Sequence, residues 1–264
     1  MHDLYAAIFL VVFAGFLIWF FNYLGRSGRW KVPDGGLTKK DRLVMASKVR
    51  FYKDMSDEEK KLFEFKISEF LANVKITGIG VKVTRSDELL IAASAVIPIF
   101  RFPEWQYLNL SEVLLYEKSF NDSFQTGDDM HDHDISGMVG DGYMNGKMIL
   151  SKHDLHWGFN SEWDGSNVGI HEFIHLIDKA DGSVDGIPKL FLEHQYIVPW
   201  VELIHQNIGQ IMQGRSDINP YGATDKTEFF AVVSEYFFEN PKKFKANHPD
   251  LYELMEKIFR VSKD

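Results

Sequence analysis

Apolar positions along the chain recur mainly at helical spacing, and a few short runs alternate as strands do. Ser56, followed three residues later by Glu59, forms a capping-box pattern that opens an amphipathic helix. A first helical region is predicted to begin near Asp41. The other predicted helices cover Ser56 to about Leu71, Asp87 to about Phe100, Asn167 to Lys179, roughly Lys189 to Gln213, Thr224 or Asp225 to Asn240, and Pro249 to about Val261. The predicted strands are Glu112 to Tyr116 and Lys147 to Leu150. This balance predicts an α+β fold, mainly helical with a small sheet.

The N-terminal apolar run stands apart from this pattern. Tyr5 to Leu24 carries no charge, and about 20 residues at 1.5 Å each can span a hydrocarbon core of about 30 Å. A cleaved signal peptide is disfavoured by the lack of basic residues before the run, and a buried core helix by the lack of a polar face. Arg26, Arg29 and Lys31 follow the run, so the positive-inside rule puts the body of the protein in the cytoplasm.

The sequence therefore predicts a single-pass protein of the inner (cytoplasmic) membrane whose folded domain faces the cytoplasm. The predicted organisation is a short extracytoplasmic N-terminus (1–3), one transmembrane helix (4–24), a glycine-containing linker (25–40) and one domain (41–264).

Composition narrows the chemistry that this domain can perform. The chain has 264 residues, 45% of them hydrophobic, which is enough for one sizeable core. A net charge of −9 argues against direct binding to nucleic acid, which needs an excess of lysine and arginine. Cysteine is absent, so disulfides and thiolate metal sites are excluded, and any metal must be held by histidine and carboxylate side chains.

An HExxH motif offers such side chains. His171 and His175 are four residues apart, so on a helix both imidazoles lie on one face and can reach one ion. Glu172 follows the first histidine directly, which is the position of the general base in metal sites of this kind. The intervening Phe173 and Ile174 are apolar and favour an interior helix, where a metal would compensate the polar groups. An exposed helix whose polar side chains are only solvated is the simpler alternative.

Two imidazoles do not complete a catalytic zinc site, so a third protein ligand is expected downstream. Glu228 and Glu235 are seven residues apart within an aromatic run, two turns along one helical face. One can bind the metal while the other orients a histidine, and composition does not choose between them. Asp178 is a further candidate for such a supporting contact.

The motif HEFIHLID, followed by DGIP and by NPYGATDKTEFFAVVSEYFF, resembles the Mlc titration factor A family of glucose-regulated zinc metallopeptidases, most strongly over residues 147–238. The same pattern is also similar, more distantly, to the catalytic domain of anthrax lethal factor. The resemblance implies a zincin-like metallopeptidase domain that binds Zn²⁺. It implies these roles for individual residues: His171, His175 and Glu228 as metal ligands, Glu172 as the catalytic base, and Tyr221 as the donor to the oxyanion.

The resulting prediction is a membrane-anchored zinc peptidase that hydrolyses a peptide or protein substrate through a metal-activated water, with membrane contact through residues 4–24. The predicted strand from Lys147 to Leu150 is expected to offer an edge to an extended substrate. One alternative is a regulatory binding module that sequesters a transcriptional repressor and has weak or conditional peptidase activity. Another is a structural membrane protein whose HExxH motif is incidental.

Two further groups of histidines receive a simpler interpretation. His131 to Asp134 lies among glycines and aspartates and is interpreted as a solvated acidic loop rather than a second metal site. His153 and His156 lie shortly before the HExxH motif and are interpreted as structural or exposed.

Overall fold

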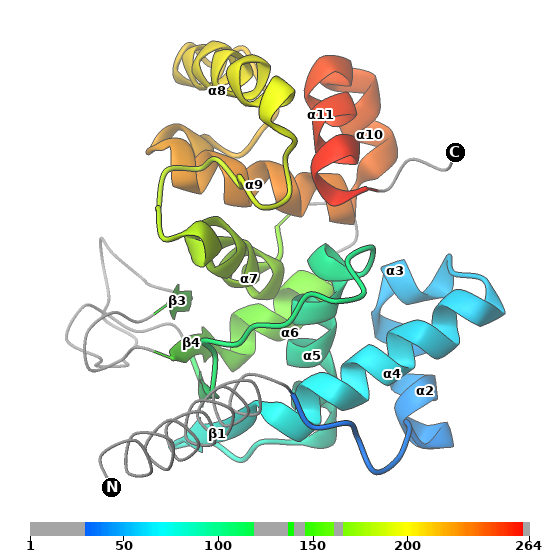
Figure 1. Cartoon of the computed structure of the whole chain (residues 1–264). Helices are drawn as coiled ribbons and strands as arrows, with labels where there is room; N and C mark the ends of the chain where they lie inside the picture. The colour runs from blue at the N-terminus through cyan, green and yellow to red at the C-terminus, as the bar shows by residue number, and fades with distance from the viewer. Residues whose placement is uncertain (1–29, 119–136, 140–145, 161–165, 261–264) are drawn as a thin grey trace, which may run out of the picture.

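The computed structural model of the chain describes residues 30–118, 137–139, 146–160 and 166–260 (Figure 1). The α-helices of this part are α2 (Lys39–Lys48), α3 (Arg50–Lys53), α4 (Asp57–Asn73), α5 (Arg85–Ile99), α6 (Lys152–Asn160), α7 (Val168–Asp178), α8 (Ile197–Met212), α9 (Lys226–Glu239), α10 (Pro241–Asn247) and α11 (Pro249–Phe259). Short 3-10 turns are η2 (Lys179–Asp181), η3 (His194–Tyr196) and η4 (Pro220–Ala223). The strands are β1 (Lys75–Ile79), β2 (Glu112–Tyr116), β3 (Gly137–Val139) and β4 (Lys147–Ser151).

The strands form one four-stranded sheet in the order β1-β2-β4-β3. β1, β2 and β4 are parallel, with Glu112 paired to both Lys75 and Lys147, and β3 runs antiparallel to β4. The predicted α+β class with a small sheet is confirmed in this respect. The expectation that the Lys147–Leu150 strand offers an edge is wrong, because β2 and β3 pair with both sides of β4.

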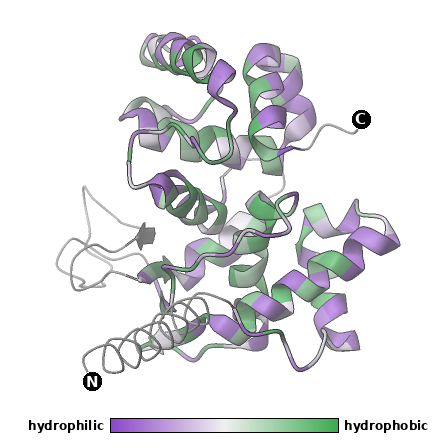
Figure 2. Ribbon diagram, in the orientation of Figure 1, coloured by the Kyte–Doolittle hydropathy of each residue, from purple (hydrophilic) through white to green (hydrophobic). Residues whose placement is uncertain are grey.

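α5 and α7 form the centre of the domain, with α9 packed on the other side of α7 (Figure 1). α5 is apolar nearly all round, and Leu89 and Ile91 are completely buried. Gly169 permits the close approach of α7, because a Cβ there would collide with the side chain of Ser94 on α5. In contrast, α4, α8 and α11 alternate between hydrophilic and hydrophobic residues, as helices at the surface do (Figure 2).

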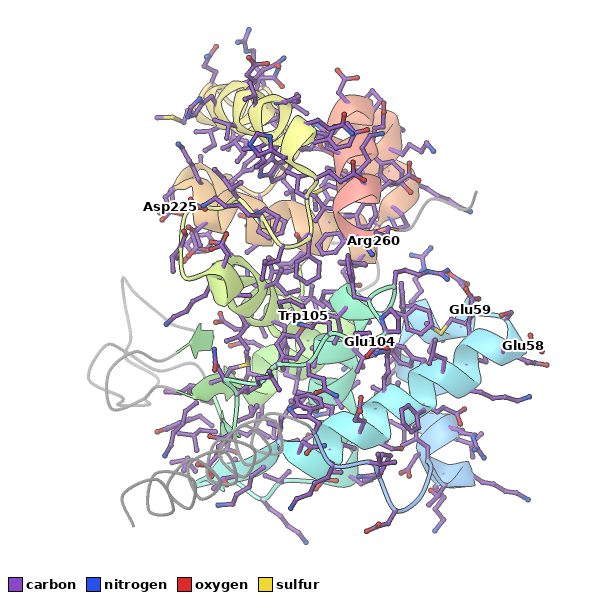
Figure 3. The ribbon with its side chains drawn as sticks, viewed as in Figure 1. Glu58, Glu59, Glu104, Trp105, Asp225 and Arg260 are labelled. Carbon is purple, nitrogen blue, oxygen red and sulfur yellow. The ribbon has the colours of Figure 1, made fainter. Side chains whose placement is uncertain are left out.

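Capping signals in the sequence set several helix starts. Ser56 accepts a hydrogen bond from the backbone of Glu59, whose carboxylate in turn accepts one from the backbone of Ser56, so the predicted capping box is confirmed. Asp225, labelled in Figure 3, caps α9 by accepting from the backbone N–H groups of Thr227 and Glu228. The predicted start of α9 is therefore confirmed.

The predicted helix from Lys189 to Gln213 begins later than expected. α8 starts at Ile197, and the preceding residues form turns in which the N–H of Leu192 donates to the carbonyl of Pro188. Phe191 and Leu192 are buried in this turn, so burial rather than helix formation accounts for their apolar character. β1, β3, α6 and α10 were not predicted from the pattern.

The membrane prediction requires correction. No helix in the ranges that the structure describes is both long and apolar enough to cross a membrane. The predicted transmembrane segment, residues 4–24, lies outside those ranges. The fold described is therefore the helical domain with its sheet. The prediction of a preceding transmembrane helix and of a single-pass inner-membrane location is not retained.

Part of the predicted linker contacts the domain. The backbone N–H of Lys31 donates to Asn73, and the Asn73 amide donates back to the carbonyl of Lys31. The Trp30 ring lies 5.9 Å from that of Phe70, and Leu37 is buried. Trp30 and Lys31 thus lie against α4.

Candidate metal centre

α7 carries the HExxH residues, and its sequence explains their position. Asn167 caps the helix by accepting a hydrogen bond from the N–H of Ile170 at 3.1 Å. The apolar side chains at Phe173 and Ile174 are completely buried in the core. His171 and His175 then share the remaining face, with ring centroids 4.7 Å apart. The interior helix that the sequence predicts is confirmed, and the exposed alternative is wrong.

Three side chains of α7 lie close enough together to bind one ion. Potential ligand atoms of His171, Glu172 and His175 are all within 4.8 Å of one another. Within the described ranges no comparable group of histidine or acidic side chains lies in another part of the fold. Glu172 is only 5% exposed, and burial raises the pKa of its carboxyl group, while the neighbouring histidines oppose the shift.

α9 contributes a carboxylate from the opposite side. The Oε2 atom of Glu228 lies 2.9 Å from Nε2 of His171 and 3.6 Å from Nε2 of His175. Burial alone would raise the pKa of Glu228, but contacts with the two histidines lower it to about 2. One carboxylate oxygen therefore faces both imidazole nitrogens, and all three atoms converge.

Glu235 occupies a different position around the same histidine. Its Oε1 atom lies 2.7 Å from Nδ1 of His171, and its other oxygen accepts a hydrogen bond from the backbone of Asn167. Burial would lower the pKa of His171, but the charges and hydrogen bonds of Glu235 and Glu228 outweigh it and raise the pKa well above its usual value. The two glutamates, which spacing could not separate, thus contact opposite nitrogens of one ring.

Tyr221 lies beside this group in η4. Its ring centroid is 6.0 Å from that of His171, and its backbone N–H is held by the side chain of Asn219. Burial and the negative charges of Glu228 and Glu172 raise the pKa of the Tyr221 hydroxyl. The phenol therefore stays protonated at neutral pH and can donate a hydrogen bond.

The other candidate residues lie apart from this group. Asp178 is completely buried, and its Oδ2 atom accepts from the N–H of Gly186, while Oδ1 has no hydrogen-bond partner among the described residues. His156 contacts Asp87 at 2.5 Å, which fits the structural interpretation. His131 to Asp134 lies outside the described residues.

Sequence reasoning missed two supporting residues, Asn167 and Gly186. Asn167 is the first residue of the predicted helix, but its capping role was not predicted, although asparagine directly before an apolar periodic run is an N-cap signal. Gly186 lies in an Asp-Gly pair whose contacts involve α8 and α9, and no local signal indicates such partners.

The donor atoms fit a divalent metal ion. Two imidazole nitrogens from α7 and one carboxylate oxygen from α9 converge here, and they are a common set of ligands for a catalytic metal. A mainly helical domain with an HExxH helix and a convergent downstream glutamate has the site of a metallopeptidase.

The chain belongs to a metallopeptidase family. The profile of the glucose-regulated metallo-peptidase M90 family matches residues 26–260, which confirms the predicted family. An uncharacterised protein of Synechocystis sp., slr2042, is 29% identical over 82% of each chain. Mlc titration factor A of Pectobacterium atrosepticum is 26% identical over 78% of this chain and 80% of its own. Mlc titration factor A of Salmonella arizonae is 30% identical, over 69% and 74% respectively.

Proposed function

We propose that this protein is a zinc-dependent peptidase whose metal ligands are His171, His175 and Glu228. The observation that carries the proposal is the convergence of Nε2, Nε2 and Oε2 from these residues. Zinc is the ion of choice because the set contains nitrogen and oxygen donors, and because three protein ligands leave a position open. The family match supports the metallopeptidase part of the proposal.

The bound ion would supply Lewis acidity, which lowers the pKa of water and polarises a scissile carbonyl. Glu172 accepts the proton of the attacking water and passes it to the leaving amine. The burial that raises its pKa suits both steps, because a general acid–base works best when its pKa is near the operating pH.

Tyr221 and Glu235 complete the proposed reaction. The Tyr221 hydroxyl donates a hydrogen bond to the oxyanion that forms from the substrate carbonyl. Its 53% exposure indicates access from solvent, as a residue that contacts substrate requires. Glu235 accepts a hydrogen bond from Nδ1–H of His171 and thereby keeps Nε2 available as a ligand atom.

A digest of an unbiased peptide library by the full-length protein tests the proposal. We expect cleavage after reconstitution with Zn²⁺, loss of cleavage with a chelator, and a loss of at least about 100-fold in the Glu172→Gln variant. The control is Glu202→Gln, an exposed glutamate on α8, which should cleave like the wild type. Equal cleavage by Glu172→Gln and the wild type after metal loading would contradict the mechanism.

Binding of a transcriptional repressor is a second candidate function, favoured by the name of the relatives. Mlc titration factor A of Pectobacterium atrosepticum is by its name a protein that titrates Mlc. The corresponding test is binding of an Mlc-type repressor to the wild type and to Glu172→Gln. Binding that survives the substitution, in a protein without cleavage activity, would favour capture over peptidase action.

A further inference from the structure

Gly186 lies where three helices meet. It belongs to the loop between α7 and α8, which passes beside the first turn of α9 (Figure 1). Its N–H donates to Oδ2 of Asp178, the last residue of α7, at 3.0 Å. Its carbonyl accepts from Nε1 of Trp200 on α8 at 2.8 Å. Asp178 and Trp200 are both completely buried, so both hydrogen bonds lie in the interior.

The third contact of Gly186 is with the backbone of α9. A Cβ at this position would lie 2.6 Å from the carbonyl carbon of Lys226 and would collide with its carbonyl oxygen. Lys226 is the first residue of α9, two residues before Glu228. The φ angle of Gly186 is +71°, which other residues adopt only at a cost. Glycine is therefore required both by conformation and by the close approach of α9.

Trp200 contacts α9 at the two residues that follow Glu228 in the sequence. Its ring lies 6.2 Å from that of Phe229 and 5.8 Å from that of Phe230. Gly186 therefore packs against the α9 backbone just before Glu228, and Trp200 packs against the side chains just after it. The hydrogen bond between Trp200 and Gly186 joins these two supports.

We propose that Gly186 is a positioning residue that sets the separation of α7 and α9 and so holds Glu228 against His171 and His175. The inference rests on the proposed metal site. A carboxylate ligand on a separate helix can bind only if that helix has the correct distance and orientation. Asp178, Gly186 and Trp200 connect the end of the histidine helix to the start of the glutamate helix through two hydrogen bonds and one backbone contact.

The same loop offers a matched control at Gly182. Its φ angle is +90°, so alanine imposes a comparable conformational cost there. However, a Cβ at Gly182 would meet no atom within 4 Å. Gly182→Ala and Gly186→Ala therefore differ mainly in the collision with α9.

The experiment measures binding of Co²⁺ and Zn²⁺ to the full-length chain by chelator competition, together with the visible absorption spectrum of the Co²⁺ form. We expect Gly186→Ala to weaken metal binding roughly 10- to 100-fold and to change the Co²⁺ spectrum. Gly182→Ala should keep the affinity and spectrum of the wild type. Circular dichroism verifies that each variant is folded.

Trp200→Phe provides a second test in case Gly186→Ala does not fold. Phenylalanine keeps an aromatic ring against α9 but removes the Nε1 donor to Gly186. We expect weaker metal binding than in the wild type, and unchanged affinity and spectrum would overturn the inference. Equal metal binding by folded Gly186→Ala and Gly182→Ala would also overturn it. Failure of the wild type to bind either metal would instead overturn the proposed function.

Discussion

The Oε1 atom of Glu235 lies 2.7 Å from Nδ1 of His171, while Glu228 lies 2.9 Å from Nε2 of the same ring. When a metal ion binds, a carboxylate on Nδ1 would keep the proton there and leave the lone pair of Nε2 to the ion. The other oxygen of Glu235 accepts from the N–H of Asn167, which caps α7. One side chain thus fixes both the start of the histidine helix and the orientation of its first histidine.

We expect Glu235→Gln to weaken Zn²⁺ binding roughly 10- to 100-fold, because the amide is a weaker acceptor for the Nδ1 proton. Competition with a chromogenic chelator measures the affinity. The control is Glu239→Gln on the same helix. Glu239 accepts from the Asn167 amide, a role that glutamine retains, so this variant should bind zinc normally. If both variants bind zinc with wild-type affinity, Glu235 has no orienting role.

Removing the Tyr221 hydroxyl should affect turnover rather than metal binding. We expect Tyr221→Phe to lower kcat by about 100-fold or more, as loss of an oxyanion donor does elsewhere. Tyr221 is 53% exposed, so the stability of the fold should change little. Steady-state kinetics on a cleaved library peptide, with a zinc titration alongside, separates the two effects. A variant that keeps wild-type kcat would exclude Tyr221 as the donor.

Metal binding should stabilise the folded chain. At a free Zn²⁺ concentration of about 100 times Kd, binding adds about 2.7 kcal/mol to the free energy of unfolding. For a domain of this size we expect the melting temperature to rise by roughly 5–10 °C. His175→Ala should lose the shift, whereas His205→Ala, at an exposed position on α8, should keep it. A shift of the same size in His175→Ala would place the ion elsewhere.

Asp217 should make stability depend on acid pH. Burial would raise its pKa, but hydrogen bonds from Tyr236, His248 and Asn247, with a contact from Lys243, hold that pKa well below its usual value. A depressed pKa stabilises the fold fully above the unfolded-state value of about 3.9, and the contribution is lost as the pH falls towards the folded-state pKa.

We therefore expect Asp217→Asn to lower the free energy of unfolding by about 1–3 kcal/mol at pH 7. The difference from the wild type should shrink below about pH 4, where the aspartate of the unfolded chain binds a proton. Urea denaturation at pH 7, 5 and 3.5 measures this, with Asp34→Asn at an exposed position as the control. A difference that is constant across this range would show that charge on Asp217 does not matter.

Capping residues and apolar spacing within single segments were enough to predict several helices of the fold. The capping box at Ser56 gave the start of α4, and the apolar run after Asp87 gave the buried helix α5. The helix of the HExxH motif was predicted with its register, because histidines four residues apart share a face in any α-helix. The extent of α8 was predicted wrongly, since apolar residues can be buried in turns as well as in helices.

Tertiary structure decided what depends on residues far apart along the chain. Spacing made Glu228 and Glu235 equivalent, because both lie on one face of α9, and only the packing of α9 against α7 brings one to Nε2 and the other to Nδ1 of His171. The contacts of Gly186 with Trp200 on α8 and with Lys226 on α9 could not be predicted either, because both helices follow it in sequence and no local pattern indicates them.

The sequence by itself determined the HExxH helix, the absence of thiolate ligands and the membership of a metallopeptidase family. These follow from residue identity and from the fixed geometry of an α-helix. The distance between α7 and α9 was decided by the fold alone, because it results from close packing around Gly186 and Trp200. The convergence of His171, His175 and Glu228 therefore depends on contacts that no single segment of the chain contains.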